Sequence, residues 1–457
     1  MNTPLEGRFD IHRVTMACAG LALALGLAAC GGGGGGNGPG SKQLNLVVGN
    51  SLPISGNAKA LGDSGEKASE LAVDQIKKAV GEADAEHTLR VVSEDQGRDA
   101  DSATAAAKKL VNVDRASCLT GPWSSDAVEQ VAKDIVIPAK VLEISPVPAN
   151  ETVSELSDHD LVDSTALPVS LEGSALSKAI DRDLGGAQGH TVNVAASNDS
   201  YGDTLTQDFI QAWQGQDGTV GGQIVLAPPP LSSSSTSGYS GTTGYSGSSV
   251  YSSQAQQLTT GSPDAVLVID DLTGFSQLAP ALSSSYSWDP NTAWGSDQLV
   301  TPSLPDQVGS DTVDGMRALA PGTPKGEGAS SAFVQAFKSG DPRNVKLAPF
   351  AAQEFDATVL CYLAAVAAGS TDGQQMADHL IDLTAPGGER LSWQQLPDAI
   401  KALEDGKDID YTGASGPIDM DVQGDPTSGV FDVYQYSSSR LEIVGEVSAS
   451  KPNPATP

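Results

Sequence analysis

The sequence contains little positive charge. It has 26 Lys and Arg residues against 57 Asp and Glu residues, which gives a formal net charge of −31. Nucleic acids and anionic membrane surfaces attract proteins through clustered Lys and Arg side chains. The charge balance therefore argues against nucleic acid and against an anionic membrane surface as partners, and it favours a soluble, acidic protein.

Residues for catalysis and for metal binding are also scarce. The five histidines stand apart, and no His-x-x-x-His or Cys-x-x-Cys spacing provides a metal site. Gly62-Asp63-Ser64-Gly65 places its second glycine one residue too early for a nucleophile elbow. No nucleophile, base and orienting residue share a recognisable spacing, so the sequence does not support an extracellular hydrolase. We expect no metal, no cofactor and no enzymatic activity.

Long apolar runs are limited to the N-terminus. Arg8 and Arg13 precede an apolar run over residues 17–29, and Cys30 follows its Leu-Ala-Ala end directly. This order is typical of a secretory signal with a bacterial lipobox, in which the cysteine becomes the new N-terminus and takes a diacylglycerol. The alternative is an ordinary signal peptide with an incidental cysteine. No other apolar run is long enough to span a bilayer, so we expect lipid on Cys30 to anchor the chain on the extracytoplasmic face of the cell membrane.

Four cysteines are present in all. Cys18 leaves with the signal and Cys30 is lipidated, which leaves Cys118 and Cys361 in the folded part. An exported pair can form a disulfide. Because Cys118 ends an apolar strand and Cys361 lies in an apolar helix, two buried free thiols fit the sequence equally well.

Apolar strands alternate with helical patterns along the remaining chain. Residues 44–49 and 89–93 are short apolar strands, and the residues between them repeat apolar side chains at helical spacing. A second series of the same kind begins near Pro168. Such alternation predicts an α/β fold of parallel sheets with right-handed crossovers, and two series predict two lobes with a cleft.

Residues 117–152 form the centre of the predicted site. They read as strand, polar loop, helix, strand and a second polar loop, with Ser124 and Ser125 in the first loop and Ser145 to Ala149 in the second. Because the carboxyl ends of parallel strands open onto the ligand crevice, we expect both loops to line one wall. The alternative is that both serines only cap the following helix.

The second series places acidic and aromatic side chains at equivalent positions. Asp270 and Asp271 directly follow a fully apolar strand, Asp297 follows a shorter one, and Tyr201 lies in the loop after another. Side chains at these strand ends face the crevice in open α/β sheets. We expect them to form the facing wall.

A low-complexity segment, residues 228–253, interrupts this series. It contains almost only Ser, Gly, Thr, Tyr and Pro, and Gly-Tyr-Ser-Gly occurs twice in it. Such a composition cannot bury enough apolar surface to offset the entropy lost on ordering. We therefore expect a disordered surface insertion that ligand binding does not need.

Six short segments resemble, in order, the signature segments of a known family. They are Val48-Gly49 with Pro53-Ile54-Ser55-Gly56, Ser124-Ser125, Ile144-Ser145-Pro146, Asp199-Ser200-Tyr201-Gly202, Phe355-Asp356-Ala357, and Gly413-Ala414-Ser415-Gly416-Pro417 with Asp419. Behind a lipobox and in this order, they resemble the type I periplasmic binding proteins, and among these the leucine/isoleucine/valine-binding proteins of ABC importers. The resemblance covers residues 44–447 except for the insertion.

The resemblance implies an α/β fold of two Rossmann-like lobes, each with a parallel central sheet, joined by three crossings. The implied parts are a signal peptide at 1–29, a lipidated cysteine and Gly-rich tether at 30–43, lobe 1 at 44–165 and 316–412, lobe 2 at 166–315 and 413–448, and a tail at 449–457.

The resemblance also implies roles for the predicted site residues. In such proteins one lobe supplies donors to a ligand carboxylate, which correspond here to Ser125 and to the loop after Ser145. The facing lobe supplies an aromatic hydroxyl, here Tyr201, and an acid for the ligand ammonium, here Asp297. The positions of Asp270 and Asp271 also lie in the family's pocket. A zwitterion taken out of water needs donors at one end and an acceptor charge at the other.

Three departures from the family pattern leave the ligand open, and one is that Asp270-Asp271 replaces positions that are often aromatic in the family, which adds negative charge near the ammonium end. Val147-Pro148-Ala149 has no hydroxyl where the family usually has a threonine, and Asp297 is one methylene shorter than the usual glutamate. We expect a branched-chain or other hydrophobic amino acid as ligand, with a more cationic, amide or urea-like ligand as alternatives. The expected partners are an ABC permease and its ATPase, and the rival role is a sensor of the same fold.

Overall fold

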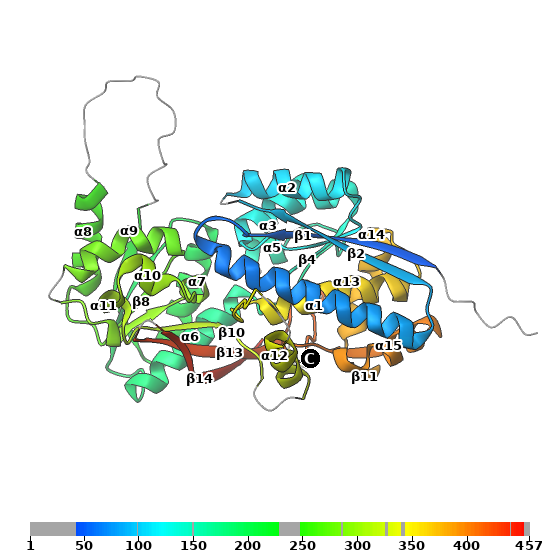
Figure 1. The fold of residues 1–457 in the computed structure, drawn as a ribbon. Helices are drawn as coiled ribbons and strands as arrows, with labels where there is room; N and C mark the ends of the chain where they lie inside the picture. The colour runs from blue at the N-terminus through cyan, green and yellow to red at the C-terminus, as the bar shows by residue number, and fades with distance from the viewer. Residues whose placement is uncertain are drawn as a thin grey trace, which may run out of the picture. The chain divides into compact units, whose positions relative to one another are not determined.

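A computed structural model describes residues 43–97, 99–148, 150–227, 247–284, 287–324, 328–339, 343–438 and 440–451 (Figure 1). The predicted signal peptide, the lipidation site Cys30 and most of the tether lie outside these ranges, and so does Ala149. Within them, no helix combines the length and the apolar character that crossing a bilayer requires.

The first sheet has five parallel strands in the order β2-β1-β3-β4-β5. They are β1 (Leu44–Leu52), β2 (His87–Asp95), β3 (Cys118–Thr120), β4 (Leu142–Ser145) and β5 (Val162–Ser164). Helices cover both faces of this sheet, as Figure 1 shows for α1 (Lys59–Ala83) and α2 (Ala100–Asn112). The inner strands β3 and β4 are therefore buried along their whole length, as is typical of parallel sheets, whereas the edge strand β2 exposes Thr88 and Arg90.

Most of the remaining elements of this half share one hydrophobic core with the sheet. The helix α13 is buried from Ala351 to Val366, which explains its largely apolar composition. The elements are η1 (Gly56–Ala58), α3 (Ser125–Val131), η2 (Ala132–Val136), α4 (Ile137–Ala139), α5 (Glu151–Ser154), α12 (Gly328–Lys338), α13 (Ala351–Ala368), α14 (Gly373–Thr384), β11 (Glu389–Ser392), η5 (Trp393–Gln395), α15 (Leu396–Glu404) and β12 (Ile409–Thr412).

The second sheet has seven strands in the order β14-β13-β10-β9-β8-β6-β7. The pairs from β7 to β10 are parallel, and a hairpin adds β13 and β14 antiparallel at one edge. The strands are β6 (Thr191–Ala196), β7 (Thr219–Val225), β8 (Ala265–Ile269), β9 (Ala293–Gly295), β10 (Arg317–Pro321), β13 (Ser428–Ser437) and β14 (Arg440–Ser450).

Strand β8 shows why its sequence is apolar without interruption. Leu267 and Ile269 pack into the core under α6 and α7, whereas Val266 and Val268 pack into a separate core under α8 and α9. Successive side chains of a strand point to opposite faces, so both faces need apolar residues. The helices of this half are α6 (Val169–Leu184), α7 (Ser200–Gln214), α8 (Gly247–Thr259), α9 (Leu272–Ser283), η3 (Pro290–Thr292), η4 (Asp297–Leu299), α10 (Leu304–Val308) and α11 (Ser310–Val313).

These two mainly parallel sheets confirm the predicted α/β fold class. In the described chain, the path leaves the first sheet after β5, leaves the second sheet after β10 for a separate parallel pair of β11 and β12, and returns to the second sheet after β12. The lobe boundaries remain predictions, but β10 belongs to the second sheet although it lies beyond residue 315, and Ala414 and Met420 pack into the first core although they lie beyond residue 412. Strand patterns reveal a strand but not the sheet that it joins.

The predicted insertion lies outside the described residues up to position 246. Its last part is not a disordered segment, because α8 begins at Gly247 and Tyr251 is buried against the second sheet. Tyr251, Ala255 and Leu258 recur at helical spacing on the buried side of α8. The Ser-rich composition conceals the start of this pattern.

Cys118 and Cys361 form a disulfide that joins β3 to α13. Their Cα atoms are 6.0 Å apart, although 243 positions separate them in the sequence. Of the two alternatives that the sequence leaves open, the structure has the disulfide.

Candidate ligand-binding site

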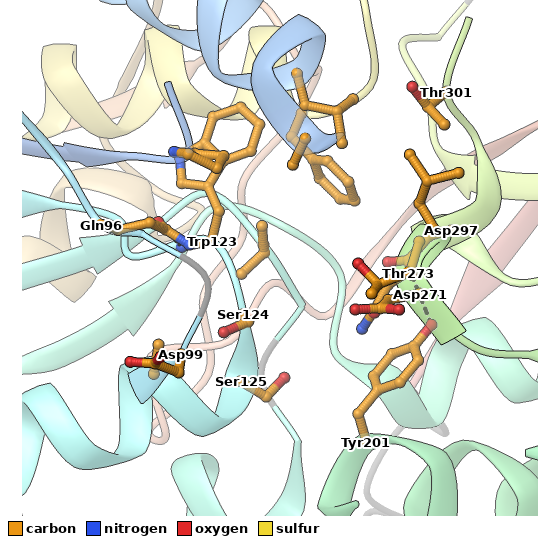
Figure 2. Close-up of a pocket in the computed structure, with 18 of the residues that line it drawn as sticks. Gln96, Asp99, Trp123, Ser124, Ser125, Tyr201, Asp271, Thr273, Asp297 and Thr301 are labelled. Atoms are coloured by element: carbon orange, nitrogen blue, oxygen red, sulfur yellow. Dashed lines mark hydrogen bonds between the residues drawn. The ribbon is translucent and has the colours of Figure 1, made fainter. Parts of the chain in front are cut away.

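A cavity of about 180 Å³ lies where strand ends of both sheets meet (Figure 2). The five-stranded sheet contributes the loop after β3, and the seven-stranded sheet contributes residues that follow β6, β8 and β9. The carboxyl ends of parallel strands therefore form the cavity, as expected for an open α/β sheet.

The loop after β3 places Trp123 in the cavity wall. Gly121 has a φ of +80°, and a Cβ atom at this position would lie 2.2 Å from the carbonyl oxygen of Ser51. Only glycine fits this turn. The backbone N–H of Trp123 donates to Oε1 of Gln96 at 2.8 Å, which fixes the backbone of the loop at Trp123.

Two aromatic rings make one end of the cavity apolar. The ring of Trp123 meets Phe350 edge to face, with 5.9 Å between the ring centroids. A Cβ on Gly65 of α1 would lie 2.4 Å from the Trp123 ring, so the indole packs directly on the helix backbone. This packing gives the wall a rigid apolar surface.

Ser124 and Ser125 differ in whether their hydroxyl group is already hydrogen-bonded within the protein. Ser125 is buried and its Oγ donates to the carbonyl oxygen of Pro148 at 3.1 Å. Ser124 precedes α3 but makes no side-chain capping bond. The alternative in which both serines only cap the helix is therefore wrong, and Ser124 has the hydroxyl that is free to contact a ligand (Figure 2).

The opposite wall carries Tyr201 and Asp297 in direct contact. The Tyr201 hydroxyl donates to Oδ1 of Asp297 at 2.6 Å (Figure 2). Tyr201 is positioned at the start of α7, which Asp199 caps by accepting the N–H of Gly202. Asp297 begins η4 directly after β9. Both side chains are at least 95% buried.

A third buried group, Glu172 of α6, completes this wall from behind. Its Oε1 accepts the backbone N–H of Asp297 at 3.0 Å, and both of its carboxyl oxygens lie 3.4 Å from the Tyr201 hydroxyl. Glu172 has no exposed surface and does not line the cavity. Two acids and a phenol therefore share one buried site.

Burial shifts the titration of all three groups. It raises the pKa of Asp297 to about 6, although hydrogen bonds from Tyr201 and from the N–H of Gln298 oppose the rise. Burial, followed by the charge of Asp297, raises the pKa of Glu172 well above its usual range. Burial and the two neighbouring acids raise the pKa of Tyr201 in the same direction. A negative charge in this site is thus costly, and the two acids compete for it.

Asp270 and Asp271 occupy different environments. Asp271 is exposed, lines the cavity and caps α9 by accepting the N–H of Gly274 at 2.6 Å. Asp270 is buried outside the cavity lining, where its Oδ1 accepts the N–H of Asp271 at 2.9 Å. Burial raises the pKa of Asp270 to about 8. Of the two, only Asp271 is placed to meet a ligand.

The structure thus brings five of the eight predicted site residues to the cavity: Ser124, Ser125, Tyr201, Asp271 and Asp297. Ser145 is buried behind the wall, within 3.4 Å of the carbonyl oxygens of Pro122 and Val147. It does not line the cavity. Ala149 lies outside the described residues.

Sequence reasoning missed several lining residues and the acid behind them. Gln96, Asp99, Thr273, Gln298, Thr301 and Phe350 line the cavity, and Glu172 supports it. Gln96 and Asp99 follow β2 and Gln298 and Thr301 follow β9, so the strand-end rule could have found them. Phe350 and Glu172 have no such signal, since Phe350 precedes α13, which follows a helix, and Glu172 lies inside the first turn of α6. Among the described residues, no group of three or more His, Cys, Asp and Glu side chains is arranged to hold a metal ion.

The sequence profile of a family described as periplasmic binding protein matches residues 45–437. A curated relative, the chemotactic signal transduction system substrate-binding protein BasB of Halobacterium salinarum, is 24% identical over 422 residues, which is 87% of this chain and 88% of BasB. Two solved structures share the fold. One is LivJ, the branched-chain amino acid transporter substrate-binding protein of Streptococcus pneumoniae, in complex with isoleucine, with a TM-score of 0.66, 16% identity, and coverage of 89% of this chain and 99% of LivJ. The other is a solute-binding protein of an R. palustris ABC transporter in complex with benzoate, with a TM-score of 0.64, 17% identity, and coverage of 90% and 98%.

Proposed function

Because the chain belongs to the periplasmic binding protein family, it is a solute-binding protein and not an enzyme, and we propose that it captures an amino acid of the branched-chain or hydrophobic class for an ABC importer. The observation that carries the proposal is the buried acid Asp297, held by Tyr201 at the cavity wall. None of the ion pairs among the described residues includes Asp297. A ligand ammonium is the natural partner for such an acid.

The rest of the cavity supports a zwitterion with an apolar side chain. Ser124 offers a hydroxyl donor on the wall opposite Asp297, and Trp123 and Phe350 offer an apolar surface. The ligand carboxylate would bind near Ser124, the ammonium near Asp297, and the side chain against the rings. Each end of the ligand would then replace hydrogen bonds that it loses on leaving water.

The cavity favours an amino acid over the benzoate of one structural neighbour. The described lining residues include three acids, Asp99, Asp271 and Asp297, and no Lys, Arg or His. Benzoate has one negative charge and no cationic group, so these carboxylates would repel it. Neutral amide or urea-like ligands would leave Asp297 without an ionic partner.

A thermal-shift screen followed by calorimetric titration tests this proposal. L-Leucine, L-isoleucine and L-valine should raise the unfolding midpoint of the purified chain, whereas benzoate and urea should not, because only a ligand of the folded state stabilises it. Asp297→Ala should weaken binding by about 2–5 kcal/mol, since it leaves a buried ammonium unpaired. Ser124→Ala should cost about 1–2 kcal/mol for one hydrogen bond. Stabilisation by benzoate and not by any amino acid would contradict the proposal.

A second role, chemotactic sensing, is favoured by the relative BasB, whose name assigns it to a chemotactic signal transduction system. Ligand capture is common to both roles, so binding does not separate them. Deletion of the gene separates them: loss of labelled leucine uptake indicates transport through a permease and an ATPase, whereas normal uptake with lost migration toward leucine indicates sensing.

We also propose that the protein is exported and held at the extracytoplasmic face of the cell membrane by lipid on Cys30. The Leu-Ala-Ala-Cys sequence and the following glycines support the anchor. The disulfide between Cys118 and Cys361 supports an oxidising compartment outside the cytoplasm.

A further inference from the structure

Glu172 lies behind the cavity wall and does not contact the cavity. It does contact Asp297 and Tyr201, the two residues that we assign to the ligand ammonium. It accepts the N–H of Asp297 at 3.0 Å and lies 3.4 Å from the Tyr201 hydroxyl. All three side chains are at least 95% buried. Any charge that Glu172 takes therefore acts directly on Asp297.

The hydrogen bonds in this cluster are distributed unequally between the two acids. Tyr201 has one hydroxyl proton, and its 2.6 Å contact commits that proton to Asp297. Asp297 also accepts the backbone N–H of Gln298. Glu172 receives only the N–H of Asp297 at normal hydrogen-bond distance. The better-solvated acid holds the negative charge, so the geometry puts the charge on Asp297 and a proton on Glu172.

No neighbouring cation changes this assignment within the described chain. The groups that act on Glu172 are Asp297 on η4 and Tyr201 on α7. The cations of α6 and β10 are placed elsewhere: Lys178 of α6 is exposed, Arg182 of α6 donates to the carbonyl oxygen of Glu446, and Arg317 of β10 pairs with Asp183. Of the other acids that line the cavity, Asp271 lies on the same wall and Asp99 on the opposite one, and both add negative charge only.

We propose that Glu172 is a positioning residue: it stays protonated, holds Asp297 through its backbone N–H, and leaves the buried Tyr201–Asp297 pair with a single negative charge. This single charge at the buried pair then matches one ligand ammonium. This inference rests on the proposed function for the ligand ammonium at Asp297.

Two neutral substitutions separate the charge of Glu172 from its contact with Asp297. Glu172→Gln keeps a carbonyl acceptor for the Asp297 N–H, whereas Glu172→Met has a similar size but no such acceptor. We expect Glu172→Gln to bind L-leucine within about threefold of wild type, and Glu172→Met to bind it at least tenfold more weakly. Because only ionised Asp297 holds an ammonium, affinity should fall as the pH drops below about 6, with the same midpoint in wild type and in Glu172→Gln.

A ligand-free titration distinguishes a failure of this inference from a failure of the proposed function. The carboxyl carbon of Asp297 is followed by NMR in protein labelled with ¹³C-aspartate, with Asp297→Asn to assign the signal. Coinciding midpoints in wild type, Glu172→Gln and Glu172→Met support the inference even if L-leucine does not bind. A midpoint that falls by more than one pH unit in the neutral variants overturns it, because removal of a negative charge at Glu172 would then ease the ionisation of Asp297. Equal loss of leucine affinity in both variants with unchanged midpoints overturns the positioning role.

Discussion

Asp297→Asn should stabilise the ligand-free protein at neutral pH. Burial raises the pKa of Asp297 from 3.8 to about 6, so the folded protein resists the ionisation that the unfolded chain undergoes freely. At about 1.4 kcal/mol for each pKa unit, this rise corresponds to roughly 3 kcal/mol of lost stability. Asparagine keeps an oxygen acceptor for the Tyr201 hydroxyl but has no charge to bury, so the variant should recover this free energy.

The sign of the pH dependence makes this prediction specific. The wild type has no disadvantage below the unfolded pKa, where Asp297 is protonated in both states. Its disadvantage grows as the pH rises from 3.8 to about 6 and is complete above that value. The free energy of unfolding, measured in urea at pH 3.5, 5 and 7.5, should therefore differ little at the lowest pH and by up to about 3 kcal/mol at the highest.

The control for this measurement is Asp271→Asn, a change at the exposed acid of the same cavity that keeps an oxygen to cap α9. It should change the free energy of unfolding by less than about 0.5 kcal/mol at each pH. If Asp297→Asn is no more stable than wild type at pH 7.5, or if its advantage does not depend on pH, the inference that Asp297 is a buried acid without a compensating charge is wrong.

Three further changes test other parts of the molecule. The double variant Cys118→Ser, Cys361→Ser should have a free energy of unfolding about 2–5 kcal/mol lower than wild type. Reduction should lower the melting temperature of wild type but not of the variant, and equal melting temperatures of oxidised and reduced wild type would contradict the disulfide. Replacing residues 232–246 by a short Gly/Ser linker should leave leucine affinity within about threefold of wild type, under about 1 kcal/mol. Extending the replacement to Ser252 should destabilise the fold, because it removes buried Tyr251. Cys30→Ala should release the protein to the medium or leave it unprocessed, and a variant that stays membrane-bound at mature size would disprove the lipid anchor.

The sequence was sufficient for the parts of the site that follow strand ends. Asp271, Asp297 and Tyr201 could be predicted because a short apolar run followed by a polar residue marks the carboxyl end of a buried strand. The same rule does not distinguish neighbours within a loop. It selected Asp270 together with Asp271, although the first side chain turns inward and the second turns to the cavity.

The supporting residues could not be predicted because their roles depend on tertiary contacts. Glu172 lies in the first turn of α6, where an acid normally interacts favourably with the helix dipole and points to solvent. Only the packing of α6 against η4 and α7 buries it. Phe350 reaches the cavity with a φ of +67°, a conformation that no sequence pattern predicts for phenylalanine. The sheet membership of β10 was missed for the same reason, since strand pairing is not local.

The bond between Cys118 and Cys361 closes a covalent ring around most of the seven-stranded sheet, because β6 to β10 lie between the two cysteines in sequence. A protease that cuts the chain once inside this ring cannot separate the two products. A cut between Tyr201 and Asp297, for example, leaves one product with Trp123 and Tyr201 and the other with Asp297 and Phe350, still joined through sulfur. A binding protein outside the cell could thus survive a single nick with every part of its cavity attached, and gel mobility would reveal the damage only after reduction.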